Sequence, residues 1–502
     1  MPGVSVTTSV RVGPVGADGT SSAFFLVGSA ERGPVDRGRL VVGLNQFEAI
    51  YGDYKSNFTL WDYVKTFFEE GGNRCYVSRG IGAGNAVASV PVLDGDTDTS
   101  FTLYAKNPGE WANTSGGVEG LKAIVTTTAG ATTIEIYYKG SVVFTAGPFE
   151  DETLPDSSIK YAKQFIVEAI NAAPSLSELL YAAVGDGVLN PESGTYSLVG
   201  GADGSAVTDS EIVSALELFD YDMGAGAVSA PGWAGSTIWN ALRDHAIANR
   251  RIALCGFEIG TSKTTAINDA SSYWGSTAAL REKGSYMAFF WPSIKVPDGY
   301  GSVRDQAPEA YVAAARARAH QSTGSWRAGA GEISTARYVT GLYEQVTRVA
   351  GDNLDDNRVN ALRVINGAVR VYGARSISSD EINWRFITYR DTLNYVTAQA
   401  ESTLEPLVFR PIDGRGSLFG EIEARLIAIM EPVRVAGGSY PGFDEETGRP
   451  LDPGYSVNVS SVNNPTNSLA AGIVSASIGV RVSPVADKYN ITITKSTLTA
   501  SV

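Results

Sequence analysis

Both ends of the chain have the residue pattern of a β-strand, and neither has an obvious partner strand nearby in sequence. Residues that a strand can bury on one face stand at every second position, as in Val4, Val6, Thr8, Val10 and Val12, and again in Tyr489, Ile491 and Ile493. This alternation predicts half-buried strands. Chain ends usually lose such patterning, and a strand with bare N–H and C=O groups is a template for pairing with another molecule. The two ends therefore predict a chain that donates strands to its neighbours.

The rest of the composition fits a large globular protein. A chain of 502 residues is long enough for several domains. It is 43% hydrophobic and 19% charged, which is typical of folded rather than disordered chains. The formal net charge is -14, and Lys and Arg are scattered without runs. A direct nucleic-acid partner is therefore not expected, because binding phosphates requires a basic surface.

The sequence also predicts where the protein is made. Cys75 and Cys255 lie in apolar, strand-like surroundings, which favours buried thiols over a disulfide. The start of the chain has neither the basic region nor the apolar segment of a secretion signal. No apolar run approaches the ~18 residues of a membrane span. We expect assembly in a cytoplasm and no insertion into a membrane.

The order of predicted elements indicates a multidomain α/β protein. Residues 23–90 together with 196–371 alternate buried strands with amphipathic helices, which predicts a central α/β domain with a largely parallel sheet. Residues 91–195 contain short alternating segments between loops and predict an inserted β-rich domain. Residues 372–502 predict a small α+β domain whose sheet is completed by strands exchanged between subunits. Residues 1–22 and 484–502 are the expected N-terminal and C-terminal arms.

Two helices have expected ends that can be compared with the structure. Ile212, Leu216 and Phe219 follow helical spacing, and Asp209 or Ser210 is expected to cap this helix. In the C-terminal domain a second apolar face is expected to end at Pro432 and Gly437-Gly438, and its members are Leu418, Ile422, Leu426 and Ile429.

The histidines and the acidic motifs do not predict a metal site. His245 and His320 are the only histidines, and neither has a second histidine at metal-ligand spacing, so both are expected to be partly exposed structural residues. Asp94–Asp98 matches the first ligands of a calcium loop. However, Thr99 stands where the turn glycine belongs and Ala105 where the bidentate Glu belongs, which favours an acidic surface loop.

Motifs for catalysis are also incomplete. Gly260–Thr264 follows a predicted strand and opens a helix, as a phosphate loop does, but Lys263 does not directly follow a glycine. Asp355-Asp356 lies in a polar turn and is expected to face solvent rather than to act as an acid–base pair. We predict no catalytic residue, no cofactor and no metal, and therefore not an enzyme.

Several short motifs follow one another along the chain: Met1–Val4, Asn107–Asn113, Val199–Gly204, Trp291–Asp298, Trp326–Ala328, Gly373–Ile377, Trp384–Ile387, and Asn463-Asn464 with Gly472 and Pro484. In this order they resemble the contractile tail sheath family of bacteriophages and related injection machines. Ala112 stands where the family has a glycine in its Pro-Gly-x-Trp-Gly-Asn turn. Residues 307–319 are also richer in Ala and Arg than the corresponding family segment.

The resemblance implies a helical homopolymer of rings, commonly sixfold, around a rigid inner tail tube protein. Each subunit donates its terminal strands to neighbours, and contraction triggered at the baseplate drives the tube into a cell envelope. The implied partners also include baseplate and tail terminator proteins, and the implied location is a virion tail assembled in a bacterial cytoplasm. In that arrangement the inserted domain lies outside. The candidate contact with the tube is the polar side of the helix beginning near Ser417, with Arg415, Glu421 and Arg425.

Two other classes of function remain open from the sequence. Another self-assembling shell or surface-layer protein would also exchange strands, but it would lack an inner-tube partner. An α/β enzyme with a disguised site would instead bind a small ligand.

Overall fold

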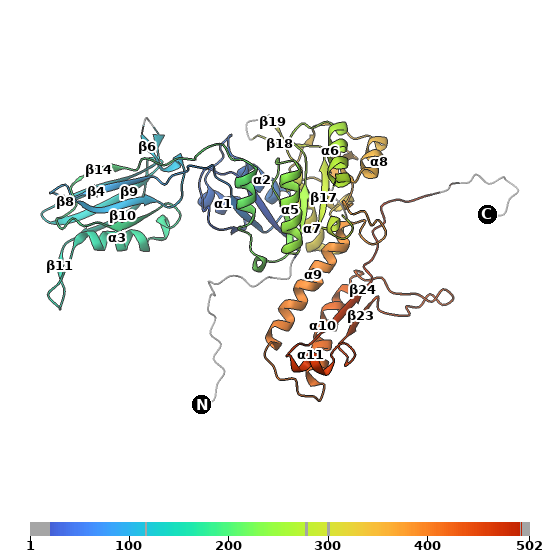
Figure 1. Ribbon diagram of the computed structural model, residues 1–502. Coiled ribbons are helices and arrows are strands. Elements are labelled where there is room, and N and C mark those ends of the chain that lie inside the picture. Colours follow the sequence, from blue (N-terminus) through green and yellow to red (C-terminus); the bar gives the residue numbers. More distant parts are fainter. Residues whose placement is uncertain (1–20, 116–117, 277–279, 299–301, 492, 494–502) are drawn as a thin grey trace, which may run out of the picture.

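The computed structural model describes residues 21–115, 118–276, 280–298, 302–491 and 493. These residues form a central lobe, an inserted lobe on one side of it, and a C-terminal lobe that projects below it (Figure 1). The N-terminal residues on which strand donation was predicted, Val4, Val6, Thr8, Val10 and Val12, lie outside the described residues.

The central lobe is built on an eight-stranded sheet in the order β2-β3-β1-β15-β16-β17-β21-β22. The strands are β1 (Ala23–Gly28), β2 (Arg39–Val41), β3 (Cys75–Arg79), β15 (Gly226–Ser229), β16 (Arg251–Cys255), β17 (Met287–Trp291), β21 (Val359–Ile365) and β22 (Ala368–Val371). The inner strands run parallel, and β2 and β22 are antiparallel at the two edges. Every residue of β1, β3, β15, β16 and β17 is buried, as expected of parallel strands covered on both faces.

Helices cover both faces of this sheet and form two apolar cores. One core contains side chains from α1 (Leu44–Tyr51), α2 (Leu60–Glu69) and α7 (Glu309–Ser322). The other contains side chains from α4 (Asp209–Leu216), α5 (Ser236–Ala248), α6 (Lys263–Ser276) and α8 (Arg348–Asp356). A small sheet of β18 (Ile294–Pro297), β19 (Val303–Gln306) and β20 (Gly341–Leu342) lies beside them. This is the mixed α/β architecture that the sequence predicts.

Helix α7 is buried on all sides, although it has no apolar face. Its residues from Glu309 to His320 are all buried, and alanines alternate with two arginines. Small side chains let neighbouring elements approach closely around the whole helix, so that even its charged residues are enclosed. Each buried charge then needs a partner, because an unpaired charge in the interior is costly.

Glu309, at the start of α7, has a strongly perturbed ionisation. A Cβ on Gly256 would lie 2.6 Å from Glu309 Oε1, so the carboxyl is packed against the carboxyl end of β16. Burial raises the pKa of Glu309 from 4.5 to about 8. Between these values the folded chain keeps a proton that the unfolded chain has lost. The free energy of unfolding must therefore fall as pH rises through this window, by up to ~1.4 kcal/mol per pH unit.

We expect Glu309→Gln to remove most of this pH dependence and to be more stable than the unaltered chain at pH 8. Urea unfolding at a series of pH values between 4.5 and 8 measures it. The exposed Glu332→Gln is the matched control, and it should unfold with the same pH dependence as the unaltered chain. If the free energy of unfolding varied with pH in the same way for Glu309→Gln and for the unaltered chain, Glu309 would be ionised in the folded protein.

The inserted lobe has its own sheets and its own core. One sheet has the order β13-β5-β4 and another β10-β9-β8-β14. The strands are β4 (Ser89–Leu93), β5 (Thr99–Ala105), β8 (Leu121–Thr128), β9 (Ala131–Tyr138), β10 (Ser141–Phe149), β13 (Leu180–Val184) and β14 (Gly194–Ser197). The short pairs β6 (Thr114–Ser115) with β7 (Val118–Glu119) and β11 (Glu152–Thr153) with β12 (Ile159–Lys160) extend the lobe. Helix α3 (Ala162–Ala172) contributes Ile166 and Ile170 to the core.

Two arginines join the inserted lobe to the central one. Arg79, at the end of β3, donates hydrogen bonds to the carbonyl oxygens of Gly33 at 3.2 Å and of Pro108 at 2.9 Å. The guanidinium of Arg32 lies over the ring of Trp111, 5.4 Å from its centroid. Pro108 and Trp111 belong to the Asn107–Asn113 motif, so this motif forms part of the junction between the lobes.

The C-terminal lobe contains α9 (Ile387–Leu404), α10 (Ser417–Val435), β23 (Tyr455–Asn458), α11 (Thr466–Ala470) and β24 (Ser477–Val480). Helix α9 runs out of the central lobe and carries the rest of the C-terminal lobe (Figure 1). Because α9 belongs to both lobes, its first turns are the structural link between them.

One expected helix cap was wrong, and the expected end of the second helix was right at Gly437-Gly438 but wrong at Pro432. Thr208 caps α4 in place of Asp209 or Ser210, and its backbone N–H donates to Glu211 Oε2 at 2.8 Å in a capping box. Pro432 lies inside α10 rather than ending it. Pro432 has no backbone N–H, so the carbonyl oxygen of Ala428 lacks its helical hydrogen bond. Ala428 is exposed, and water can solvate this oxygen instead. The helix ends before Gly437, whose φ of 79° suits glycine.

Candidate assembly interface

The sheet of the C-terminal lobe has only two strands. β23 and β24 are antiparallel, with Tyr455 opposite Val480 and Asn458 opposite Ser477. Helices α9 and α10 cover one face of this pair. They form small apolar clusters with it, whose buried members are Val396, Leu407, Leu418, Ile422, Leu426, Met430, Val433 and Val459. The C-terminal lobe therefore packs two long helices against a sheet of only two described strands.

Both outer edges of this sheet are open along β23 and β24, and Ser439 forms an isolated bridge with Val482 just beyond β24. No third strand pairs with β23 or β24 among the described residues. A two-stranded sheet is marginally stable by itself, and its free N–H and C=O groups can pair with an added strand. The lobe thus presents two acceptor edges.

The C-terminal arm has the composition to pair with such an edge, but the residues of it that the structure describes form no strand. Tyr489, Ile491 and Ile493 are 80%, 82% and 91% exposed, respectively, and no secondary structure is assigned to these three residues. Figure 1 shows this segment extending away from the body of the molecule. Alternating apolar residues held in solvent gain about 25 cal/mol per Å² when a partner buries them.

The three predicted tube-contact residues do not form one cluster. Arg415 is exposed in the loop before α10, where its backbone N–H donates to Asp413 Oδ1 at 3.2 Å. Arg425 instead donates to the carbonyl oxygen of Thr403 at 2.8 Å and pairs with Glu421 at 2.8 Å. The hydrogen bond from Arg425 lowers the pKa of Glu421. Glu421 and Arg425 are thus engaged within the lobe, and of the three only Arg415 presents a side chain with no partner in the described chain.

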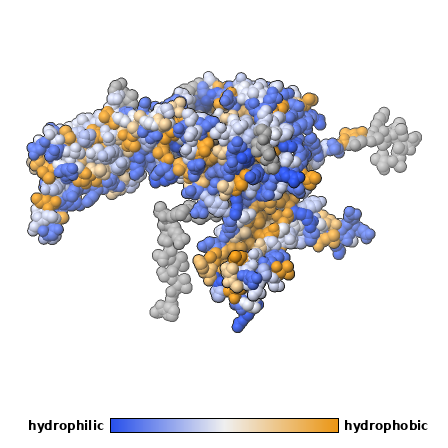
Figure 2. Space-filling view, in the orientation of Figure 1, coloured by the Kyte–Doolittle hydropathy of each residue, from blue (hydrophilic) through white to orange (hydrophobic). Residues whose placement is uncertain are grey.

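The C-terminal lobe also exposes many apolar side chains. Val408 and Phe409 lie in the loop between α9 and α10, and Ile427 and Val435 lie on the outer side of α10. Figure 2 shows apolar residues gathered along this lobe. Exposed apolar patches are typical of surfaces that contact another protein.

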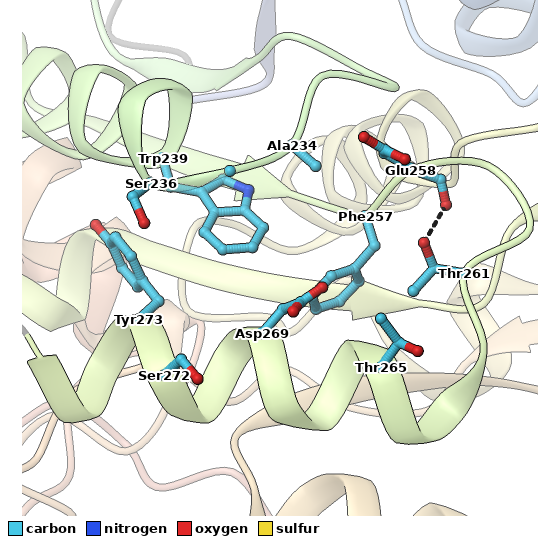
Figure 3. Close-up of a pocket in the computed structure, with 11 residues that line it drawn as sticks. Ala234, Ser236, Trp239, Phe257, Glu258, Thr261, Thr265, Asp269, Ser272 and Tyr273 are labelled. Atoms are coloured by element: carbon cyan, nitrogen blue, oxygen red, sulfur yellow. Dashed lines mark hydrogen bonds between the residues drawn. The ribbon is translucent and has the colours of Figure 1, made fainter.

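A polar hollow lies in the central lobe beside the incomplete phosphate-loop motif (Figure 3). It has a volume of about 560 Å³ and is lined by residues of α5 and α6 and by the loop after β16. Thr261 Oγ1, from the motif, donates to the carbonyl oxygen of Glu258 at 2.7 Å. Glu258 and Asp269 add two carboxylates, and among the described residues that line the hollow none is Lys or Arg. This electrostatic setting opposes phosphate binding.

The two histidines occupy different environments. His245 is half-buried and accepts a hydrogen bond at Nε2 from Arg251 Nη1, 2.7 Å away, and burial lowers the pKa of His245 to about 3. The expectation that His320 is partly exposed was wrong, because α7 is enclosed on all sides and His320 with it. Burial holds the pKa of His320 well below its usual range. Both imidazoles are therefore neutral at physiological pH.

The acidic motifs are used structurally. Asp94 is buried, and its carboxylate accepts the backbone N–H groups of Asp96, Asp98 and Leu189. Asp355 does not simply face solvent as expected, because it pairs with Arg375 at 3.4 Å. Over the described ranges, no group of three or more potential ligands could hold a metal ion. The described helices include none long and apolar enough to cross a membrane.

Buried ion pairs that were not predicted from the sequence hold α7 within the central lobe and connect it to the C-terminal lobe. Arg316 of α7 pairs with Asp391 of α9, and Arg318 of α7 lies 3.8 Å from Glu70, which directly follows α2. The unusual Ala and Arg content of residues 307–319 was the available signal, because arginines set among alanines in a buried helix require buried carboxylates. Their partners are too far away in sequence to be identified from spacing.

Comparison with solved structures shows the fold. A sheath tail protein from Listeria innocua is 13% identical, with a TM-score of 0.58 over 89% of this chain and 90% of that one. A sheath tail protein from Desulfitobacterium hafniense is 11% identical, with a TM-score of 0.55 over 91% and 93% of the two chains. The contracted sheath of an extracellular contractile injection system is 14% identical, with a TM-score of 0.52 over 99% and 98%.

No protein-family model and no curated protein matches the sequence. The structural matches extend over nearly the whole chain, so the likeness covers all three lobes. The protein therefore has the fold of tail sheath proteins, and the fold that the sequence resemblance implied is confirmed.

Proposed function

We propose that this protein is the structural subunit of a contractile sheath and that it polymerises by exchanging strands with neighbouring copies. The observation that carries the proposal is the two-stranded sheet of the C-terminal lobe, which has bare edges in a chain that also extends an alternating, exposed arm. The sheath fold supports it. The role is mechanical rather than catalytic.

The proposed division of the chain follows from this role. Residues 1–22 and 484–502 are donated arms, and residues 372–502 as a whole form the polymerisation domain. Residues 23–90 with 196–371 form the rigid body of the subunit. Residues 91–195 form the inserted domain, which faces outward because it is remote from the acceptor edges (Figure 1).

Strand exchange gives weak links that become strong in number. One donated strand forms a few backbone hydrogen bonds, each contributing about 1 kcal/mol net, so one arm contributes only a few kcal/mol. Each subunit gives two arms and receives two, and linked contacts raise the effective concentration of each. The lattice therefore holds while individual subunits turn on their arms. Contraction draws its energy from the difference between two packings of the same subunits.

The proposed partners are other copies of this chain, an inner tail tube protein enclosed by the C-terminal lobes, and baseplate and terminator proteins at the ends of the polymer. Self-assembly and a baseplate partner are supported by similar structures that come from a sheath and a baseplate.

For the inner tube, Arg415 is the proposed contact residue. We expect Arg415→Glu to weaken co-sedimentation with the tube about tenfold, the effect of losing ~1.4 kcal/mol, without changing thermal unfolding. Arg449→Glu, another exposed arginine of the same lobe, is the matched control. Arg425→Glu also breaks its contacts with Thr403 and Glu421, so the double variant with Arg415→Glu must be compared with Arg425→Glu alone. Equal tube binding by Arg415→Glu and the unaltered chain would place the contact on another surface.

Negative-stain microscopy of the purified chain tests the proposed function. Hollow, striated tubes are the expected result. Closed shells or flat lattices would favour another self-assembling protein, and a stable monomer at every concentration would contradict polymerisation.

A further inference from the structure

The chain enters the described structure through a buried contact on α7. Ser21 and Ser22 are both buried. Arg316 Nη1 donates a hydrogen bond to the carbonyl oxygen of Ser21 at 2.6 Å, and Ser21 Oγ lies 2.8 Å from His320 Nδ1. Ser21, which is the first described residue and the root of the N-terminal arm, is therefore held on α7.

The same arginine also holds α9. Arg316 Nε donates to Asp391 Oδ2 at 3.0 Å, and Arg316 Nη2 donates to the other carboxylate oxygen. The side chains of Arg316 and Asp391 are only 3% and 2% exposed, respectively. One buried guanidinium thus connects the root of the N-terminal arm, the central lobe and the beginning of the C-terminal lobe.

A second set of contacts holds the root of the C-terminal arm close to the same place. Val485 packs against the main core. Arg385, which precedes α9, donates to Asp487 Oδ2 at 3.0 Å and lies 3.6 Å from Asp355. Lys488 lies 3.9 Å from Asp355. Beyond Lys488 the exposed residues Tyr489 and Ile491 begin the free part of the arm.

We propose that the segment from Arg385 to Asp391, which leads into α9 and forms its first turn, is a common anchor for the roots of both arms. Asp391 holds Ser21 through Arg316, and Arg385 holds Asp487. The two anchoring side chains on this segment are those of Arg385 and Asp391. They lie within about 10 Å along the chain, which is less than two helical turns. If the proposed strand exchange is correct, Arg316 and Arg385 are positioning residues for it, because they hold the roots of the arms without pairing with the acceptor edges.

The two anchors differ in strength. The Arg316–Asp391 pair is buried and therefore little affected by salt. The Arg385–Asp487 pair is 28% and 40% exposed, so it is weak and screened by salt. The contact at the root of the C-terminal arm is therefore the more easily released of the two, whereas a buried pair holds the contact at Ser21.

Spin-label distances within dilute, unpolymerised full-length protein test this inference. One label is placed at Ser210→Cys on the exposed side of α4, and the second at Ala17→Cys or at Tyr489→Cys in the arms. Cys75 and Cys255 are buried and remain unlabelled. The measurement does not depend on polymerisation. The common anchor can therefore be disproved while the proposed function stands, and the proposed function can be disproved while the common anchor stands.

Arg385→Gln is expected to broaden the distance distribution to position 489 about twofold and to leave that to position 17 unchanged. Salt at about 0.5 M should do the same. The double variant Arg316→Met with Asp391→Leu removes the other anchor without leaving a buried charge, and it should broaden only the distribution to position 17. If that variant fails to fold, Arg316→Lys keeps the charge but cannot bridge Asp391 and Ser21 together, and it should broaden the same distribution.

The control is Arg434→Gln, which breaks a similarly exposed ion pair with Glu431 away from both roots and should change neither distribution. Unchanged widths in Arg385→Gln, or in the Arg316 variants, would overturn the common anchor. Broadening of both distributions by either variant would also overturn it, because it would indicate general loosening.

Discussion

Deleting residues 2–12 is expected to leave a folded monomer that forms no tubes. The deleted residues precede Ser21, the first described residue, so the cores of the three lobes keep all their described contacts. Each subunit then lacks one of the two strands that it gives. Losing a few kcal/mol at every link of a repeating lattice prevents growth altogether. Sedimentation and microscopy measure polymerisation, and thermal unfolding measures the fold.

A matched pair of substitutions sharpens this result. Val6→Asp with Val10→Asp places charges on the face predicted to be buried, whereas Ser5→Asp with Ser9→Asp places them on the opposite face of the same strand. We expect the first pair to abolish tubes and the second to weaken them only slightly. Normal tubes from the deletion, or equal effects of the two pairs, would show that this arm is not donated as a strand.

Glu70→Leu is expected to lower the free energy of unfolding by about 3–5 kcal/mol, the largest stability effect of the single substitutions considered. Glu70 follows α2 and has no exposed surface. Its carboxylate accepts the backbone N–H groups of Arg337, Tyr338 and Val339 at 2.8–3.0 Å, and Arg318 lies 3.8 Å away. Leucine would leave three backbone N–H donors without their acceptor and the buried guanidinium of Arg318 without its carboxylate partner.

The neighbouring Glu69→Leu is the control for Glu70→Leu. Glu69 is exposed, so its replacement should change the free energy of unfolding by less than about 0.5 kcal/mol. Denaturant unfolding of the two variants provides the comparison. Similar small effects at both positions would show that the carboxylate of Glu70 contributes little to holding residues 337–339.

Much of the central lobe was predictable because its strands are short, fully apolar runs. The run from Ala23 to Gly28 and the run around Ile252 predict strands buried on both faces, and both lie inside the parallel sheet. Helix α7 was not predictable in the same way. Its alanines and arginines give no apolar face, and its burial depends on Glu70 and Asp391, which are distant in sequence.

The candidate interface shows the same division. The alternation of Tyr489, Ile491 and Ile493 is local, so the sequence reveals a strand pattern, and the structure finds these side chains exposed. The anchors at Arg316 and Arg385 are set by tertiary contacts and have no local pattern. The proposed tube contact lies between these cases. Spacing placed Arg415, Glu421 and Arg425 near one helix, but spacing does not reveal that Arg425 is bound to Thr403.

Helical reconstruction of the assembled polymer tests strand exchange most directly. The account predicts that β23 and β24 of one subunit lie in a larger sheet with two strands from neighbouring subunits, one over residues 4–12 and one that includes residues 489–493. A polymer in which β23 and β24 remain a two-stranded sheet, or in which each arm folds back onto its own subunit, would contradict it.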